Sequence, residues 1–253
     1  MFRSMVLFIV LVIILGMLSY QISAKRISQV LMSSYNSMSS NSNSIQYIYD
    51  NLISINDWKE AVSTPLLCNN IKECLKVMNT VSLQDLGLHT INLENLPRAF
   101  CMHIANNDKF HVSIFIIPKK CKLPLHDHPN MSVLSKVIKG NVKMRSFNIG
   151  NDHLIKSGKK VFPANITDDI TKTTKDNSWF LTPSISNIHE FEATDETAVV
   201  FDVLMPPYSD ENGRPCHFYE ECFIDGNRFL AIGPEPELPA TVEYRGIKPR
   251  IAP

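Results

Sequence analysis

Three histidines carry the clearest chemical signal in the chain. His126 and His128 stand two residues apart in LPLHDHPNMSVLSKVIKG, and His189 lies in LTPSISNIHEFEA. On a β-strand, residues two apart point to the same face, so the two imidazoles project together while Asp127 points away. Convergent imidazoles suit a first-row transition metal. The pattern predicts a three-histidine metal site, and the alternative is a pair of ordinary strand histidines.

The remaining histidines have no partner two residues away. We interpret each of them as a surface or core residue rather than a ligand: His89, His103, His111, His153 and His217.

The histidine spacing resembles the first motif of the cupin barrel, G-x5-H-x-H-x3-4-E-x6-G. Gly140 matches the closing glycine when the acidic position falls on Val133. The opening glycine is missing, with Lys119 or Lys120 in that region. Most cupins hold their metal with three histidines and a glutamate. This chain is therefore expected to supply three neutral imidazoles only.

A closer resemblance covers about residues 97–222. The segments LPLHDHPNMSVLSKVIKGNVKMRSF, NIHEF and VVFDVLMPPYSDENGRPCHFYE are similar to the cysteamine (2-aminoethanethiol) dioxygenase and plant cysteine oxidase family of thiol dioxygenases. The resemblance implies an all-β, cupin-type double-stranded β-helix, or jelly-roll barrel, with a short helical N-terminal annex. Carried over residue by residue, it implies Fe(II) ligands at His126, His128 and His189, residues near the substrate pocket at Asp202 and Tyr208, and the cysteine after the Gly-Arg pair at Cys216.

The chemistry that this family carries out fits those residue types. Three neutral ligands leave the double charge of Fe(II) uncompensated and one face open for a thiol and O2. Such a metal lowers the pKa of a bound thiol, which then binds as thiolate, and both oxygen atoms end on sulfur as a sulfinate. Asp202 is expected to position a substrate amine or a ligand imidazole, and Tyr208 to donate to bound oxygen. The alternative for Asp202 is a solvated acid at the end of a strand, and the alternative for Tyr208 is a side chain that only packs at the rim of the site.

The resemblance implies two substrate classes, between which the sequence does not decide. They are cysteamine and the N-terminal cysteine of a protein or peptide, both of which present an amine two carbons from a thiol. Oxidation of proteins would make the chain an oxygen sensor that feeds a degradation pathway. The alternative functions are a non-catalytic metal-binding cupin module tethered to a membrane, and a different metal-dependent cupin enzyme such as an isomerase.

Two departures from the family pattern affect the site. Asn130 stands where relatives usually have glycine, which is expected to narrow the pocket mouth. Phe218 stands two residues after Cys216, where cysteamine dioxygenases have a tyrosine able to cross-link to that cysteine. Tyr219 is adjacent, but neighbouring strand residues face opposite sides. No cross-link is expected here.

The elements that must position these residues are mostly strands. From about residue 98, short β-branched or aromatic runs alternate with Asn, Asp, Gly or Pro, and no crossover helices separate them. The sheet is therefore predicted to be antiparallel, with residues 151–177 as an exposed insertion. Before it, residues 45–62 and 66–78 predict two amphipathic helices, with Asn56 or Asp57 interrupting the first and Leu67 on the apolar side of the second.

The composition argues against a nucleic-acid-binding protein and against a disulfide scaffold. The 253 residues include 25 Lys+Arg and 25 Asp+Glu, and this neutral balance gives no reason to expect nucleic-acid binding. The chain is expected to be a monomer. The six cysteines are fewer than a disulfide scaffold requires. For Cys68, Cys74, Cys101 and Cys121, free buried thiols are the favoured interpretation, with disulfides left open.

The N-terminus contains one strongly apolar stretch at residues 5–18. Residues 1–24 are interpreted as a cleaved signal peptide, or residues 5–23 as a membrane anchor that leaves the barrel in the cytosol. Cleavage would place the barrel in the secretory pathway, where the sequons at Asn130 and Asn165 would be available. The expected domains are a signal or anchor at 1–24, a Ser/Asn-rich linker at 25–44, a helical annex at 45–96 and the barrel at 97–253.

Overall fold

The structure is a computed structural model that describes residues 43–250. The predictions made for residues 1–42, including the leader, the anchor and nearly all of the linker, lie outside the described residues. Within residues 43–250, no helix is long and apolar enough to cross a membrane.

Three helices precede the strands: α2 (Asn43–Ile53), α3 (Trp58–Ser63) and α4 (Asn69–Met78). The predicted interruption of the first helical segment is confirmed, because the Asp57 side chain caps α3 by accepting the N–H of Glu60 at 2.9 Å. The predicted start of the second helix at residue 66 is wrong. The backbone before α4 turns instead, with the Leu67 N–H donating to Thr64 O, and the Leu67 side chain is exposed.

Thirteen strands follow in the described part of the chain. They are β1 (Phe100–Asn106), β2 (His111–Ile117), β3 (Lys122–His126), β4 (Ser132–Lys139), β5 (Asn141–Ile149), β6 (Leu154–Lys156), β7 (Lys159–Thr173), β8 (Trp179–Leu181), β9 (Ile188–Ala193), β10 (Ala198–Met205), β11 (Tyr219–Ile224), β12 (Asn227–Ile232) and β13 (Ala240–Val242), with one 3-10 turn at Asp210–Asn212.

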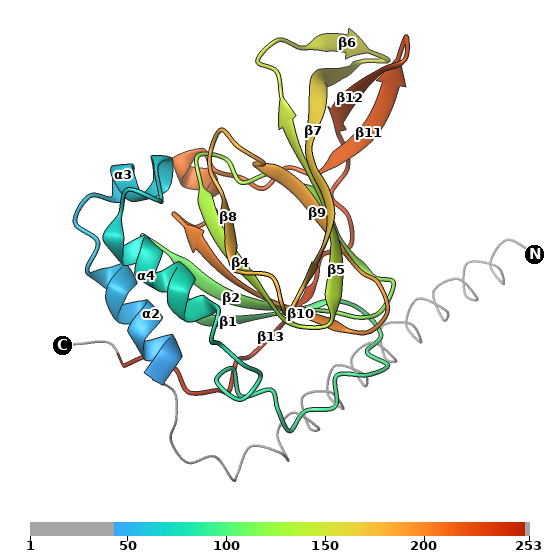
Figure 1. Ribbon diagram of the computed structural model, residues 1–253. Helices are drawn as coiled ribbons and strands as arrows, with labels where there is room; N and C mark the ends of the chain where they lie inside the picture. Colours follow the sequence, from blue (N-terminus) through green and yellow to red (C-terminus); the bar gives the residue numbers. More distant parts are fainter. Residues whose placement is uncertain (1–42, 251–253) are drawn as a thin grey trace, which may run out of the picture. The chain divides into compact units, whose positions relative to one another are not determined.

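The strands form two sheets, which are named sheet 1 and sheet 2 below. Sheet 1 has the order β13-β1-β2-β10-β4-β8, and sheet 2 has the order β11-β12-β7-β5-β9-β3, with β6 paired to β7. The two sheets curve around a shared interior (Figure 1). The predicted cupin-type double-stranded β-helix is confirmed. The prediction of a wholly antiparallel sheet is wrong at one edge, where β13 pairs with β1 in parallel.

Gly140 carries the chain from sheet 1 into sheet 2. It lies between β4 and β5 with φ of +70°, in the left-handed region that glycine adopts without strain. A Cβ built at this position would lie 2.7 Å from the carbonyl oxygen of Thr197. The glycine is therefore required both by the backbone conformation and by the close approach of the neighbouring chain.

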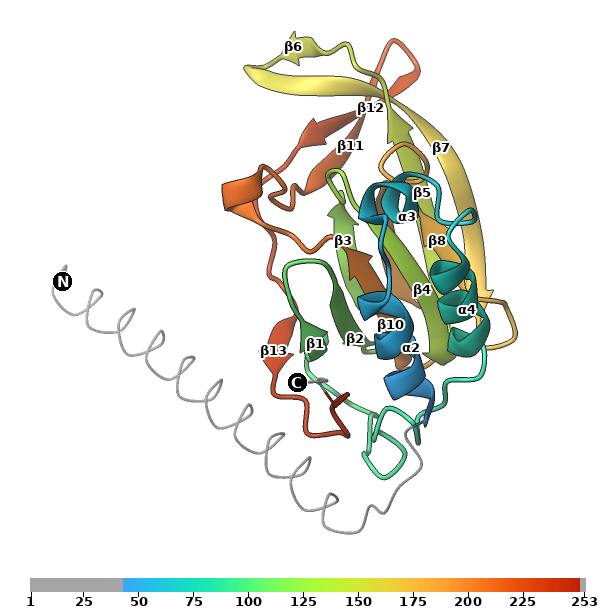
Figure 2. The same ribbon diagram turned by 90° about the vertical axis from the view of Figure 1, so that its left-hand side faces the viewer.

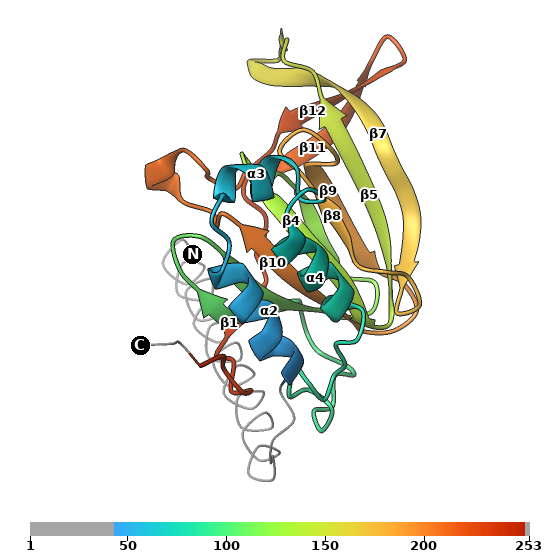
Figure 3. The same cartoon turned by 60° about the vertical axis from the view of Figure 1, so that its left-hand side comes forward.

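The helices cover the outer face of sheet 1 (Figures 1, 2 and 3). Phe110, immediately before β2, packs against the rings of Tyr49 and Trp58, with ring centroids 5.5 and 6.1 Å apart. Both faces of β10 are buried. Its outer face consists of Val199, Phe201 and Val203, and all three are buried. Apolar residues therefore occupy both faces of this strand, because helices lie on one side and sheet 2 on the other.

The segment 151–177 is not an exposed insertion. It contains β6 and the 15-residue β7, which pairs with β5 on one side and β12 on the other (Figure 2). Its polar composition gave the wrong expectation because much of β7 is exposed, while Val161 and Ala164 are buried. The many Lys, Asp and Thr side chains of this segment belong to a strand with one solvated face.

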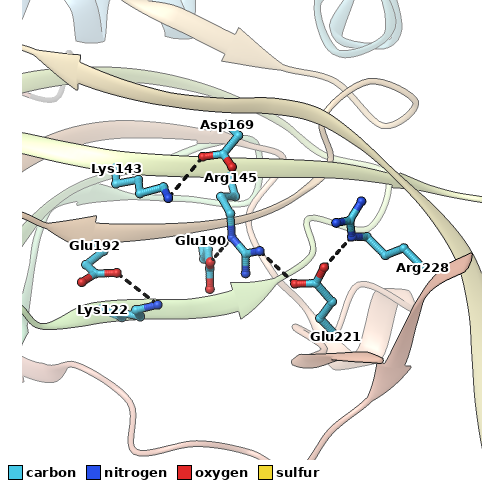
Figure 4. A network of polar contacts seen from close by, with 8 residues as sticks. All are labelled: Lys122, Lys143, Arg145, Asp169, Glu190, Glu192, Glu221 and Arg228. Carbon is cyan, nitrogen blue, oxygen red and sulfur yellow. Dashed lines mark hydrogen bonds and ion pairs between the residues drawn. The ribbon is translucent and has the colours of Figure 1, made fainter. Parts of the chain in front are cut away.

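An ionic network links the β11–β12 hairpin at the edge of sheet 2 to β5 and β9 of the same sheet (Figure 4). Arg145 on β5 donates to Glu190 on β9 at 2.6 Å and to Glu221 on β11 at 2.8 Å, and Glu221 also pairs with Arg228. Because Glu190 directly follows His189, the network connects the hairpin to the strand that carries this histidine.

Candidate metal centre

The structure brings His126, His128 and His189 together. Their ligand atoms all lie within 4.8 Å of one another, and the Nε2 atoms of His128 and His189 are 3.0 Å apart. His126 ends β3 and His189 lies in β9, but His128 lies in the turn after β3. Strand alternation alone therefore does not place His128. Asn187 does so, by accepting the His128 N–H at 3.1 Å and donating to its carbonyl oxygen at 2.8 Å.

Hydrogen bonds to the other ring nitrogens assign the tautomers of two of these histidines. The Nδ1 of His126 lies 2.7 Å from the carbonyl oxygen of Pro124, so this nitrogen carries the proton and donates. The Tyr208 hydroxyl donates to the carbonyl oxygen of Asp127 at 2.6 Å, and the Nδ1–H of His128 then donates to the tyrosine oxygen at 2.8 Å. Both rings therefore direct an unprotonated Nε2 toward the cluster.

Burial keeps the three imidazoles neutral. It lowers the pKa of His126 and holds the pKa values of His128 and His189 well below their ordinary range. Among the described residues, no carboxylate or cysteine joins this cluster. Neutral nitrogens with free lone pairs, and a defined partner on the opposite ring nitrogen, are what a bound transition metal requires of its ligands. The site fits such an ion.

Asp127, between two of these histidines, has a role that the sequence did not reveal. Its carboxylate accepts the backbone N–H of His217 at 2.8 Å, contacts the Nδ1 of that ring at 3.0 Å and accepts the Tyr219 hydroxyl at 2.9 Å. It points away from the cluster as predicted, yet it is buried. These bonds hold residues 217–219, and with them Phe218, beside His126. His217, interpreted as an ordinary histidine, is thus part of the site's support.

The three histidines line a cavity of about 130 Å³ between the two sheets. Its wall is mostly apolar and contains no lysine or arginine. The lining residues are Phe115, Leu123, Pro124, His126, His128, His189, Phe191, Asp202, Leu204, Tyr208, Cys216, Phe218, Leu238 and Pro239. All six residues predicted for the site therefore face one cavity.

Asp202 is the one carboxyl group in this lining. It is buried on β10 and hydrogen-bonds to Ser135, while its Oδ1 has no hydrogen-bond partner among the described residues. Burial raises the pKa of Asp202 to about 7. A buried oxygen without a partner is rare in proteins, and here it marks the position where a donor from a ligand would be satisfied.

Cys216 and Tyr208 contact one another in the same wall. Burial raises the pKa of Cys216 to about 12 and the pKa of Tyr208 well above its ordinary value, so both groups stay protonated. Phe218 also lines the cavity, with its ring 6.3 Å from that of His126. The Tyr219 hydroxyl is bound to Asp127 and does not line the cavity. All six cysteines of the chain are free in the structure.

Comparison with known proteins gives the family. The PCO_ADO family model matches residues 68–243. The "Probable 2-aminoethanethiol dioxygenase" of Dictyostelium discoideum is 34% identical over 139 residues, which cover 53% of this chain and 61% of that protein. "Plant cysteine oxidase 1" of Arabidopsis thaliana is 29% identical over 168 residues, which cover 62% of this chain and 57% of that protein. The chain thus spans about three fifths of the length of these curated relatives.

Among solved structures, a double-stranded β-helix domain protein from Klebsiella pneumoniae is similar with a TM-score of 0.36 and 12% identity, over 55% of this chain and 88% of that one. The family model, in contrast, matches well over half of the chain and includes all six predicted site residues. The chain belongs to the PCO_ADO family, whose members include proteins named 2-aminoethanethiol dioxygenase and plant cysteine oxidase.

Proposed function

We propose that the chain is an iron-dependent thiol dioxygenase. The observation that carries the proposal is the composition of the cavity: three convergent neutral imidazoles on one side and a single buried carboxyl with an unpartnered oxygen on the other. Fe(II) held by His126, His128 and His189 would supply the binding of a thiolate and of O2 and the transfer of both oxygen atoms to sulfur.

The protein's own groups prepare this site in two ways. Pro124 and Tyr208 set the tautomers of His126 and His128, so that the ligand nitrogens need no proton loss before they bind metal. The apolar walls exclude water, which strengthens every electrostatic contact inside the cavity. Asp202, facing the same space, offers the one carboxyl oxygen for a cationic group of the substrate.

Substrate class follows from the charges in the wall. A substrate ammonium finds Asp202 as its acceptor, whereas a free α-carboxylate finds no cationic side chain in the lining. Aminothiols without a free carboxylate fit best, namely cysteamine or a peptide whose first residue is cysteine. Free cysteine would place an unpaired carboxylate against apolar walls, which is costly.

Oxidation under ¹⁸O₂ tests the proposal. The iron-loaded chain is incubated with cysteamine, with a peptide that begins with cysteine, and with the same peptide N-acetylated. We expect two ¹⁸O atoms on the sulfur of either or both unblocked substrates and none on the acetylated peptide. Incorporation of one atom, or none into any thiol, would contradict the proposed chemistry. Equal oxidation of the acetylated peptide would contradict the role of Asp202.

A further inference from the structure

A row of polar side chains crosses sheet 1 and ends at the cavity. His103 on β1 pairs with Ser113 on β2, Ser113 pairs with Asp202 on β10, and Asp202 pairs with Ser135 on β4. Directly paired residues on neighbouring strands project from the same face, with Cβ atoms about 4.5–5.5 Å apart. The row therefore runs along the inner face of the sheet, beside apolar neighbours.

One end of the row reaches solvent through two imidazoles. Ser113 is buried, and its hydroxyl lies 3.2 Å from the Nδ1 of His103 and 3.1 Å from the Nε2 of His111. His103 is exposed and His111 half-buried, and their ring centroids are 4.3 Å apart. Ser113 thus stands between the cavity carboxyl and a pair of histidines at the surface.

The surroundings of this row keep both imidazoles neutral, so each has a free lone pair for a passing proton. Burial lowers the pKa of His103, and burial together with the neighbouring His103 lowers the pKa of His111 to about 4. The Cys101 thiol lies 3.7 Å from the Nδ1 of His103, and burial raises its pKa to about 12, so it stays protonated. Asp202 is the remaining ionisable group paired into the row.

We propose that this row is a proton exit for the cavity, running from Asp202 through Ser113 to His103 and His111. The inference rests on the proposed function, in which a thiol enters protonated and leaves as a sulfinate, so one proton must depart in each turnover. The S–H bond breaks and the proton passes to one oxygen of the Asp202 carboxylate, while the other oxygen accepts from the substrate ammonium. Ser113 then takes it while giving its own hydroxyl proton to an imidazole, and the imidazolium releases a proton to water.

The position of the row explains why such an exit is useful. Ser113 stands directly opposite Asp202 in the register of β2 and β10, and the Oδ1 of Asp202 has no partner among the described residues. A peptide substrate that occupies the cavity leaves little room there for water to carry the proton away. His103, which is exposed at the other end of the row, still reaches solvent.

The test combines a double variant with chemical rescue. In His103→Ala/His111→Ala, kcat for a peptide that begins with cysteine should fall by about 100-fold with KM unchanged, at the lower end of what a proton-transfer group contributes. Added imidazole should restore kcat, because the space left by the exposed His103 ring is open to solvent. Unchanged kcat, or a loss that imidazole does not restore, overturns the exit.

Ser113→Ala and Ser135→Ala form a matched pair. Both variants remove a buried hydroxyl beside Asp202, but Ser135 leads to no surface histidine. The solvent deuterium isotope effect on kcat should rise in Ser113→Ala and remain as in the unmodified chain in Ser135→Ala. Equal isotope effects in the two variants would show that Ser113 does not carry protons from Asp202 to the histidines.

A measurement without metal separates this inference from the proposed function. In ¹⁵N-histidine spectra of the metal-free chain, Asp202→Asn should shift the ring signals of His103 or His111, and Ser113→Ala should abolish that shift. If the ring signals of His103 and His111 do not change in Asp202→Asn, the connection between Asp202 and these histidines is refuted. If the unmodified chain oxidises no thiol, the proposed function fails, and these spectra still test whether the row is connected.

Discussion

Replacing Asp202 by asparagine should stabilise the metal-free chain, and by more at high pH. The carboxyl is buried with a pKa of about 7 in the folded chain, against 3.8 when it is free in water. Because the pKa is raised on folding, the folded state holds its proton more tightly than the unfolded state. The stability of the unmodified chain is therefore lost as the pH rises from about 4 to about 7, and it is level above that.

The size of the effect follows from the same two values. The difference between about 7 and 3.8 is about 3 pH units, and at about 1.36 kcal/mol per unit the ionised carboxyl costs ~4 kcal/mol above pH 7. Asparagine has no charge to bury. The stability advantage of Asp202→Asn should therefore grow by roughly 3 kcal/mol between pH 5 and pH 8.

Equilibrium urea unfolding of the metal-free chain at pH 5, 6, 7 and 8 measures this difference. Comparing the variant with the unmodified chain at each pH cancels the contributions of the other ionisable groups. Asp152→Asn, the same substitution at an exposed position, is the control. A stability difference for Asp202→Asn that stays constant across this range would refute the assignment of a buried carboxyl with a raised pKa.

Three further substitutions test the surroundings of the site. Tyr208→Phe removes the acceptor for the Nδ1–H of His128 and should weaken metal binding by about 10- to 100-fold in a chelator competition, and unchanged affinity would contradict the tautomer assignment. Arg145→Met leaves two partly buried glutamates without their shared cation and should lower the free energy of unfolding by about 1–3 kcal/mol, whereas a neutral effect would show the network to be only a surface feature. Gly140→Ala meets the Thr197 carbonyl in a left-handed conformation and should cost at least about 1–3 kcal/mol in the same assay, and a variant as stable as the unmodified chain would disprove that requirement.

Local sequence pattern was sufficient for most of the strands and for the choice of the three histidines. Residue type and alternation specify β1, β2, β4, β5, β9 and β10, because their apolar side chains are buried between layers. Pattern failed where polar composition hid a strand with one solvated face, as in β7, and where His128 left its strand and was held by Asn187 instead.

The support of the site was beyond local inference for another reason. Asp127 and its partners His217 and Tyr219 are about 90 residues apart in the chain, and only the folded barrel brings them together. The pairing of Ser113 with Asp202 likewise depends on the register between β2 and β10. Neither residue type nor spacing encodes a contact between strands that are neighbours in space alone.

Iron content measured together with thiol-dependent O2 uptake tests the central claim most directly. We expect about one Fe(II) per chain, consumption of one O2 for each aminothiol oxidised, and loss of both iron and uptake in His189→Ala, because two remaining imidazoles hold this metal poorly. Full iron content and full O2 uptake in His189→Ala, or thiol oxidation at the same rate after iron has been removed, would contradict the account.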